Sequence, residues 1–252
     1  MKKLLLVTLM LSVVSSIQGQ TSSGDHFDTG KGSLTIYPVL HGTLALTWGN
    51  RTILVDPYGG KDALGAFSEP DLILITDIHG DHLNSETLDE INTENALFVV
   101  PQAVADKMDE KYRQQIKVLQ NGTETVWNDI EIVALPMYNL PESADSRHTK
   151  GRGNGYVLTI GNKKIYISGD TEDIPEMRAL KDIDISFICM NMPYTMNVEQ
   201  AADAVLEFKP RVVYPYHYRG SGGLSDVEKF KSLVNAGDKN IEVRLRDWYP
   251  GN

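Results

Sequence analysis

The chain has 252 residues, of which 41% are hydrophobic and 23% charged, and its formal net charge is −10 at pH 7. This composition is typical of one sizeable globular domain and excludes a fibrous or disordered chain. The acidic balance disfavours binding to nucleic acid, which relies on clustered lysine and arginine, so we expect a small-molecule substrate as the partner.

Residues 1–19 have the layout of a secretory signal peptide, with two lysines, an apolar run and then small residues. The apolar run is short for a permanent span, so we expect no membrane anchor after cleavage. A buried N-terminal helix is the alternative interpretation. The single cysteine, Cys189, forms no internal disulfide, which together with the leader favours a periplasmic or secreted bacterial protein.

Apolar and β-branched runs that predict strands dominate the first half of the chain after this leader. Short turn signals separate them, and segments of helical composition lie between the later ones. We predict strands over 33–40, 42–49, 51–57, 71–76, 97–101, 116–119 and 125–136, and helices over 84–94 and 102–115. The turn signal over 120–124 predicts a hairpin between the last two of these strands.

After an irregular segment over 137–154, the second half repeats this style, with a hairpin and then strands and helices in alternation. Two sheets packed face to face, with helices outside both, would bury such a pattern. We therefore predict a single α/β domain over 20–252. Its later strands are expected over 155–160, 163–169, 185–192, 211–218 and 241–248, and its later helices over 172–180, 197–209 and 224–237.

The run "DIHGDH" over 77–82 concentrates metal-binding side chains directly after an apolar strand. Asp77 and His79 alternate along an extended segment and share one face, and Asp81 and His82 follow where the strand gives way to a turn. Two imidazoles and two carboxylates on a rigid base suit zinc, iron or manganese. A solvated polar turn is the alternative, but four donors in six residues favour a metal site.

Three further donors lie at predicted strand ends or in the irregular segment, namely His148, Asp170 and His217. Loops and strand ends carry the functional side chains of layered α/β folds. We therefore expect these three residues to meet the 77–82 run around one site.

In this order, the "DIHGDH" run, His148, the "SGDT" containing Asp170 and the "PYHY" containing His217 resemble the metallo-β-lactamase superfamily. Its hallmark is a His-x-His-x-Asp-His run followed by a distant His, an Asp and a last His. Residues 36–57 look like the opening hairpins of that family, and residues 190–205 are similar to its lactonase-like branch, which includes ascorbate-6-phosphate lactonase. The resemblance implies a four-layer αββα sandwich holding two divalent metal ions, with zinc expected before manganese or iron.

The resemblance also implies a role for each donor. Asp77, His79 and His148 would hold the first metal ion, and Asp170 would bridge to the second. One position departs from the family pattern, because Asp77 stands where the family has histidine. A carboxylate binds zinc at a similar distance to imidazole, so Asp77 can ligate the metal ion directly. Alternatively, it acts from outside the site, which leaves the first site weak and gives an enzyme with one metal ion. We favour direct ligation.

Asp81, His82 and His217 would hold the second metal ion. By the same resemblance, a hydroxide between the metals would be the nucleophile, because two cations lower the pKa of bound water. Asp81 would orient that hydroxide and is therefore the expected catalytic residue.

Several other polar residues border the expected site. His41 lies in an early turn, Tyr194 follows a strand end and Arg219 lies next to a proposed ligand, so we expect these three to bind substrate. Each has a structural alternative, as a hydrogen-bonded histidine, a packed ring or a surface charge. Asp56 is expected to cap a turn or support the site from behind, and Arg152 to bind an anionic group or remain a surface charge.

These features predict a metal-dependent hydrolase that acts on an ester-like bond, namely a lactone, a phosphodiester or an amide. Hydrolysis of β-lactams is one alternative, because one fold hosts many reactions. A metal-binding protein without activity is another, and Asp77 is its main support. A di-iron oxidoreductase would need a flavin partner or module, for which no segment is a candidate. The sequence predicts neither the substrate nor the oligomeric state.

Overall fold

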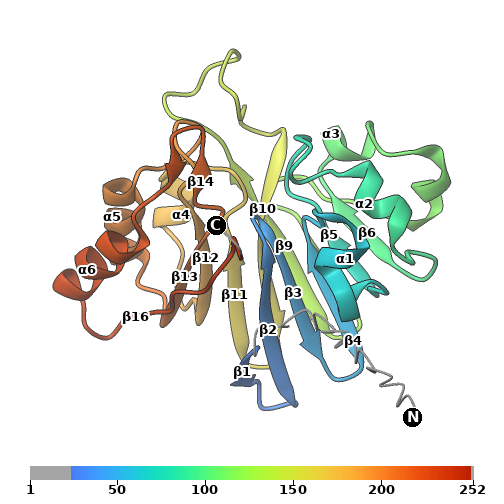
Figure 1. The fold of residues 1–252 in the computed structure, drawn as a ribbon, viewed down its shortest axis with the longest axis horizontal. Coiled ribbons are helices and arrows are strands. Elements are labelled where there is room, and N and C mark those ends of the chain that lie inside the picture. Colours follow the sequence, from blue (N-terminus) through green and yellow to red (C-terminus); the bar gives the residue numbers. More distant parts are fainter. Residues whose placement is uncertain (1–23, 251–252) are drawn as a thin grey trace, which may run out of the picture.

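The structure of the protein is a computed structural model that describes residues 24–250. The predicted signal peptide over 1–19 lies outside the described residues. Figure 1 shows two sheets side by side in the middle of the molecule, with helices against the outer face of each. Among the described residues, no helix combines the length and the apolar character that a membrane crossing requires.

The first sheet contains seven strands in chain order. Strands β1 to β4 pair antiparallel, and β4 to β7 pair parallel. The three-residue strand β5 ends just before the "DIHGDH" run. The strands are β1 (Asp25–Asp28), β2 (Ser33–Leu40), β3 (Thr43–Trp48), β4 (Arg51–Val55), β5 (Leu72–Leu74), β6 (Leu97–Val100) and β7 (Ile116–Val118).

The second sheet also contains seven strands, in the order β16-β13-β12-β11-β10-β9-β8. It repeats the plan of the first, because β8 to β11 pair antiparallel and β11, β12, β13 and β16 pair parallel. Its strands are β8 (Glu124–Trp127), β9 (Ile130–Met137), β10 (Gly153–Ile160), β11 (Lys163–Ile167), β12 (Ile185–Cys189), β13 (Val212–Tyr216) and β16 (Glu242–Val243). A small separate hairpin joins β14 (Arg219–Gly220) to β15 (Gly223–Leu224).

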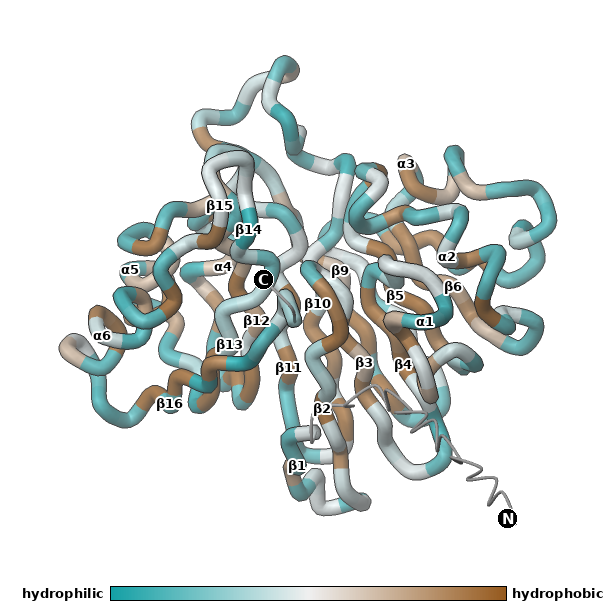
Figure 2. Tube along the Cα trace, in the orientation of Figure 1, coloured by the Kyte–Doolittle hydropathy of each residue, from teal (hydrophilic) through white to brown (hydrophobic). Residues whose placement is uncertain are grey.

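The helices complete a four-layer sandwich, which confirms the predicted αββα arrangement (Figure 1). Helices α1 (Gly60–Leu64), α2 (Ser85–Glu90) and α3 (Gln102–Ala105) cover the first sheet, and α4 (Pro175–Arg178), α5 (Val198–Phe208) and α6 (Val227–Gly237) cover the second. Hydrophobic stretches fall on the strands, and hydrophilic ones gather in the loops (Figure 2). Burial of these apolar strand faces is the main favourable contribution to folding.

Three predicted helices are shorter than expected, and the one predicted over 172–180 covers only Pro175–Arg178. The helix predicted over 84–94 covers only Ser85–Glu90, with the Asn84 side chain accepting from the Thr87 backbone N–H at 2.8 Å. The helix predicted over 102–115 is α3 followed by a separate 3-10 turn, Glu110–Gln115. Asp109 begins that turn, because its carboxylate accepts from the Lys111 backbone N–H at 2.9 Å and so starts a new helical segment instead of continuing the old one.

The predicted hairpin between 116–119 and 125–136 is wrong. Strand β7 is the last strand of the first sheet, whereas β8 begins the second, so the chain crosses between sheets at the 120–124 turn. The predicted strand over 125–136 is itself a hairpin, β8 and β9. Asn128 and Asp129 form its turn with φ of 44° and 67°, the left-handed conformation that asparagine and aspartate tolerate best.

The predicted final strand over 241–248 is also too long, since β16 contains only two residues. Beyond Val243 the chain leaves the sheet and packs across the sandwich. The Arg246 guanidinium donates to Asp25 in β1, with Nε 2.9 Å from Oδ2, and the Trp248 carbonyl accepts from the His41 backbone N–H at 3.0 Å. These long-range contacts replace the strand pairing that the local pattern suggested.

Candidate metal centre

The candidate site lies at one edge of the sandwich, where strands of both sheets end. His41 directly follows β2, and the 77–82 run comes just after β5. In the second sheet, His148 lies in the loop between β9 and β10, Asp170 comes three residues after β11 and His217 directly follows β13. The seven predicted ligands and His41 therefore meet across the two sheets.

The local sequence shapes the turn that carries four of these donors. The His82 and Leu83 backbone N–H groups both donate to the His79 carbonyl, at 3.0 and 2.8 Å, which folds the chain back after β5. The Asn84 side chain caps α2 and also donates to the Gly80 carbonyl at 3.0 Å. The turn is thus fixed at both ends, by a buried strand and by a capped helix.

The first group of donors is Asp77, His79 and His148, whose ligand atoms all lie within 4.8 Å of one another. The Asp77 carboxylate contacts His79 Nδ1, and its Oδ2 lies 4.0 Å from His148 Nε2. Asp77 and His148 are fully buried, and His79 is partly exposed. The ligand atoms of these three side chains therefore converge on one point, although the residues come from different segments of the chain.

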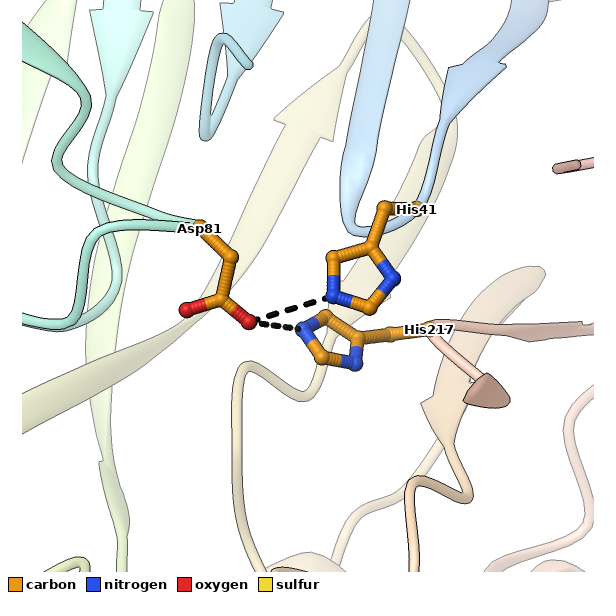
Figure 3. Close-up of side chains that lie close together, drawn as sticks. All are labelled: His41, Asp81 and His217. Carbon is orange, nitrogen blue, oxygen red and sulfur yellow. Dashed lines mark hydrogen bonds and ion pairs between the residues drawn. The ribbon is translucent and has the colours of Figure 1, made fainter. Parts of the chain in front are cut away.

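The second group is His82, Asp170 and His217, again within 4.8 Å of one another. Asp81 and His41 adjoin it, since Asp81 Oδ2 lies 3.4 Å from His217 Nε2 and 3.1 Å from His41 Nε2. Figure 3 shows the Asp81 carboxylate pointing toward both rings, with His41 coming from the turn between β2 and β3. The His82 and His217 rings are stacked, with centroids 5.0 Å apart.

Asp170 lies between the two groups. Its Oδ2 is 3.4 Å from His82 Nε2 and 3.3 Å from His148 Nε2, while its Oδ1 is 3.6 Å from His217 Nε2. The side chain is nearly fully buried. One carboxylate therefore faces both sets of imidazoles, as a ligand shared by two cations must.

Contacts behind the site orient two of the imidazoles. His82 Nδ1 lies 2.8 Å from the buried Asp56 Oδ2 and 3.0 Å from Thr76 Oγ1. His148 Nδ1 lies 3.1 Å from Asn139 Oδ1. An acceptor at Nδ1 keeps the proton there and leaves the Nε2 lone pair for a metal ion.

The buried polar atoms of the site test whether metal ions would fit there. Among the described residues, eight buried side-chain N and O atoms make no hydrogen bond, and six of them lie in this cluster, of which His79 Nδ1 has only its ion-pair contact with Asp77. Buried polar groups are nearly always satisfied, so such a concentration needs an explanation. Divalent cations would satisfy imidazole nitrogens and carboxylate oxygens together. The six atoms are His79 Nδ1, His82 Nε2, His148 Nε2, Asp170 Oδ1, and Nδ1 and Nε2 of His217.

The charges of the cluster point the same way. Burial raises the pKa of Asp170, but the charges of His217 and His82 and the contact with His148 outweigh it and hold that pKa well below its usual value. Burial likewise raises the pKa of Asp81, but its contacts with His217 and His41 lower it overall. These acids are therefore ionised at neutral pH and able to act as ligands.

His82 shows the opposite shift. Burial lowers its pKa, but the negative charges of Asp56 and Asp170 outweigh burial and raise it well above the usual value. Without a metal ion, this imidazole holds a proton that a cation must displace.

Asp77 has a partner that the sequence did not predict. Arg152 donates to both carboxylate oxygens, with Nε 3.2 Å from Oδ1 and Nη2 3.1 Å from Oδ2. Burial raises the pKa of Asp77, but the contact with His79 and the charges of His82, His79 and Arg152 lower it to about 2. The structure thus places Arg152 on a proposed ligand, instead of at the surface or in an open anion site.

The three predicted substrate residues differ in their placement. His41 joins the cluster through Asp81, and its Nδ1 lies 2.8 Å from the Tyr249 hydroxyl. Arg219 stacks on the Tyr249 ring, with its guanidinium carbon 4.4 Å from the centroid. The Tyr194 carbonyl accepts from Asn139 Nδ2 at 2.8 Å, and Asn139 in turn contacts His148. Arg219 and Tyr194 therefore border the cluster without joining it.

Sequence reasoning missed Asn139 and Tyr249 as supporting residues. The side-chain oxygen of Asn139 contacts both the backbone N–H and the ring Nδ1 of His148. The Tyr249 hydroxyl contacts the ring of His41, which lies 208 positions away in the sequence. Neither lies in a motif. Only the position of Asn139, two residues after a strand end in a long loop, was a signal that could have drawn attention to it.

Comparison with known proteins agrees with the fold and with metal dependence. Residues 35–217 match a family described as a Beta-lactamase superfamily domain. A metal-dependent hydrolase of Pyrococcus abyssi is 32% identical over 208 residues, which cover 79% of this chain and 90% of that protein. A solved structure described as a metal-dependent hydrolase from Parabacteroides distasonis is 39% identical, with a TM-score of 0.79 over 90% of this chain and 99% of that one. A metallo hydrolase from Ignicoccus hospitalis has a similar fold, with a TM-score of 0.71 at 22% identity over 85% of this chain and 95% of that one.

The comparisons correct one prediction. Curated relatives from Pyrococcus abyssi, Pyrococcus horikoshii, Pyrococcus furiosus and Thermoplasma acidophilum are archaeal proteins, and nothing in their descriptions indicates a periplasm. The prediction of a periplasmic or secreted bacterial protein is therefore wrong. The lactonase-like branch stays a prediction, because these relatives are described only as metal-dependent hydrolases.

Proposed function

The chain belongs to the β-lactamase superfamily, with metal-dependent hydrolases among its relatives, and we propose that it hydrolyses an ester-like bond of a small molecule at a site for two divalent cations. The observation that carries this proposal is Asp170, which faces His82, His148 and His217 at 3.3 to 3.6 Å. A single buried carboxylate shared by two groups of imidazoles is the arrangement that a pair of cations requires.

The donors divide into two sets in this proposal. Asp77, His79 and His148 would hold one cation, and Asp170 would be shared with the other. Four imidazoles among the seven donors favour zinc, with manganese or iron as the outcomes that metal analysis would distinguish. When bound, such cations act as Lewis acids and lower the pKa of coordinated water toward neutrality.

Asp81, His82 and His217 would complete the second set, and Asp81 has a further role. Its side chain is 33% exposed, whereas those of Asp77 and Asp170 are 0% and 4% exposed. Asp81 is thus the carboxylate among these three that solvent water can reach. We assign to it the orientation of the attacking water.

His41 positions Asp81 for this task. Its Nε2 lies 3.1 Å from Asp81 Oδ2, and its Nδ1 lies 2.8 Å from the Tyr249 hydroxyl, so the ring is held from both sides. His41 lies in the cluster, Tyr194 and Arg219 border it, and these three residues are the proposed substrate contacts. A basic side chain such as Arg219 suits a substrate with an anionic group.

The substrate classes follow from this chemistry. A carbonyl or phosphoryl centre beside two cations fits a lactone, a phosphodiester or an amide, and β-lactam hydrolysis is the second candidate within the same mechanism. The hydrolase descriptions of the relatives argue against a metal-binding protein without activity. We also propose that residues 20–252 act as one domain, because both sheets supply donors.

The test compares metal content and turnover in the wild type, His217→Ala and His26→Ala. His26 is an exposed histidine in β1 and serves as the matched control. The substrates are a simple lactone, bis(p-nitrophenyl) phosphate, an anilide and a β-lactam. We expect the wild type and His26→Ala to bind two equivalents of metal and to turn over a lactone or a phosphodiester, and His217→Ala to lose both metal and turnover. A metal-loaded wild type that hydrolyses none of the four substrates would overturn the proposal, and turnover of the β-lactam alone would replace its substrate class.

A further inference from the structure

The contact between Asp77 and Arg152 joins a proposed ligand to a permanent cation. Arg152 donates through two nitrogens to the two oxygens of Asp77, at 3.2 and 3.1 Å. The Asp77 side chain is 0% exposed and that of Arg152 is 19% exposed. A two-point contact of this kind fixes the plane of the carboxylate as well as its position.

One oxygen of Asp77, Oδ2, faces both Arg152 and the first group of donors. Asp77 Oδ2 accepts from Arg152 Nη2, touches His79 and lies 4.0 Å from His148 Nε2. The guanidinium therefore contacts the same oxygen that faces the first group of donors. An arginine there also changes the charge of the group, since a buried carboxylate without a counter-ion is costly.

The loop between β9 and β10 brings both Arg152 and the donor His148 to the site. It supplies His148, a donor of the first group, and four residues later Arg152, immediately before β10 begins. The Arg152 backbone N–H donates to the Thr149 carbonyl at 3.2 Å, which closes the intervening turn. The distance between the imidazole and the guanidinium is thus set by a short, closed piece of backbone.

We propose that Asp77 and Arg152 act as one neutral unit in place of an imidazole, with Arg152 as the positioning residue that holds Asp77 and offsets its charge. This inference rests on the proposed metal centre. The pair carries no net charge, as a neutral imidazole carries none, and it offers one oxygen to the first group. The two residues are therefore interdependent, and neither can be exchanged alone without loss.

The interdependence gives a specific expectation for histidine at position 77. In Asp77→His, the new imidazole meets the Arg152 guanidinium, which has lost its acceptor and repels any cation nearby. We expect first-site metal affinity to fall roughly 10–100-fold, the range for loss of a supporting contact at a metal site. In Asp77→His/Arg152→Gln, the repulsion is gone, and most of that affinity returns.

The experiment measures metal equivalents and dissociation constants by chelator competition with zinc. It uses the wild type, Asp77→His, Arg152→Gln, the double variant and Arg147→Gln. Arg147 lies in the same loop but stacks on Tyr194, with its guanidinium carbon 4.3 Å from the ring centroid, and so controls for loss of a loop cation. Circular dichroism checks that each variant folds, and thermal unfolding with and without zinc gives a second readout that needs no turnover.

The outcomes separate this inference from the proposed function. Recovery of first-site metal affinity in the double variant, together with wild-type metal affinity in Arg147→Gln, would support the neutral unit. Equal affinity in Asp77→His and in the double variant would overturn it and leave the proposed hydrolase site intact. A wild type that binds no metal at the first group would overturn both proposals. If Asp77→His does not fold, Arg152→Gln alone decides, since first-site affinity equal to that of the wild type would also refute a positioning role.

Discussion

Replacement of Asp56 by asparagine probes how a residue outside the donor set controls one of its ligands. Asp56 is fully buried and adopts a φ of 45°, which asparagine also tolerates, so the backbone is preserved. Its Oδ1 accepts from the Thr76 backbone N–H at 2.7 Å. Its Oδ2 accepts from the Thr76 hydroxyl at 2.6 Å and from His82 Nδ1 at 2.8 Å.

The substitution reverses both hydrogen bonds at Oδ2. The asparagine oxygen continues to accept from the Thr76 backbone N–H, so its NH₂ group takes the place of Oδ2 and must donate to the Thr76 hydroxyl oxygen and to His82 Nδ1. The His82 proton then moves to Nε2 and blocks the lone pair that would bind metal. We expect metal affinity to fall by roughly 10–100-fold, or about 1.4–2.7 kcal/mol. The metal-free protein should lose about 1–3 kcal/mol, because charged hydrogen bonds become neutral ones.

The assay is chelator competition, combined with ¹⁵N NMR of the histidine side chains to identify the tautomer. Asp71→Asn is the matched control. Asp71 lies at the opposite end of β5, where its Oδ2 accepts from the Thr52 backbone N–H at 2.8 Å and touches no donor of the site. Metal affinity in Asp56→Asn equal to that in Asp71→Asn, with His82 still protonated on Nδ1, would refute the reasoning.

Two other substitutions test the packing and the charge of the site. A Cβ on Gly42 would lie 2.6 Å from His217 Cδ2, so Gly42→Ala should displace that ring and lower metal affinity about tenfold. A Cβ on Gly80 would meet no atom within 4 Å, so Gly80→Ala should leave metal affinity unchanged. Equal metal affinities of the two variants in chelator competition would contradict this expectation. Because the pKa of Asp77 falls from 3.8 to about 2 on folding, its contribution of about 2 kcal/mol is present above pH 4 and is lost as the pH falls toward 2. Urea unfolding of the metal-free protein at pH 5 and pH 3 should therefore show a smaller drop in Asp77→Asn, and an identical drop would count against the lowered pKa.

The sequence predicted the features of this fold that depend on local pattern. Alternating and continuous apolar runs identified most strands, and the "DIHGDH" run identified four donors, because these signals lie within a few residues of one another. His148, Asp170 and His217 were found first through their positions at predicted strand ends and in a long loop, and their order then matched a family pattern. The roles of the individual donors stay predictions.

The misses have a common physical origin in contacts between distant segments. The turn at 120–124 looks like a hairpin, but its two flanking strands pair with different sheets. The segment after Val243 has strand composition, but Arg246 pairs with Asp25, and the chain crosses the sandwich instead. Asp77 was read as an isolated departure from a pattern, because its partner Arg152 lies 75 positions away. Such contacts follow from the packing of two sheets, which local propensity does not encode.

The donors of the site are divided between the sheets, with the 77–82 run on the first and His148, Asp170 and His217 on the second. Cations held there would act as a cross-link between the two sheets, so that the free energy of metal binding at the site stabilises the packing of one sheet on the other. Neither half by itself has a full complement of donors. Metal binding would therefore be a late step in folding, because it requires that the two sheets have already packed together correctly.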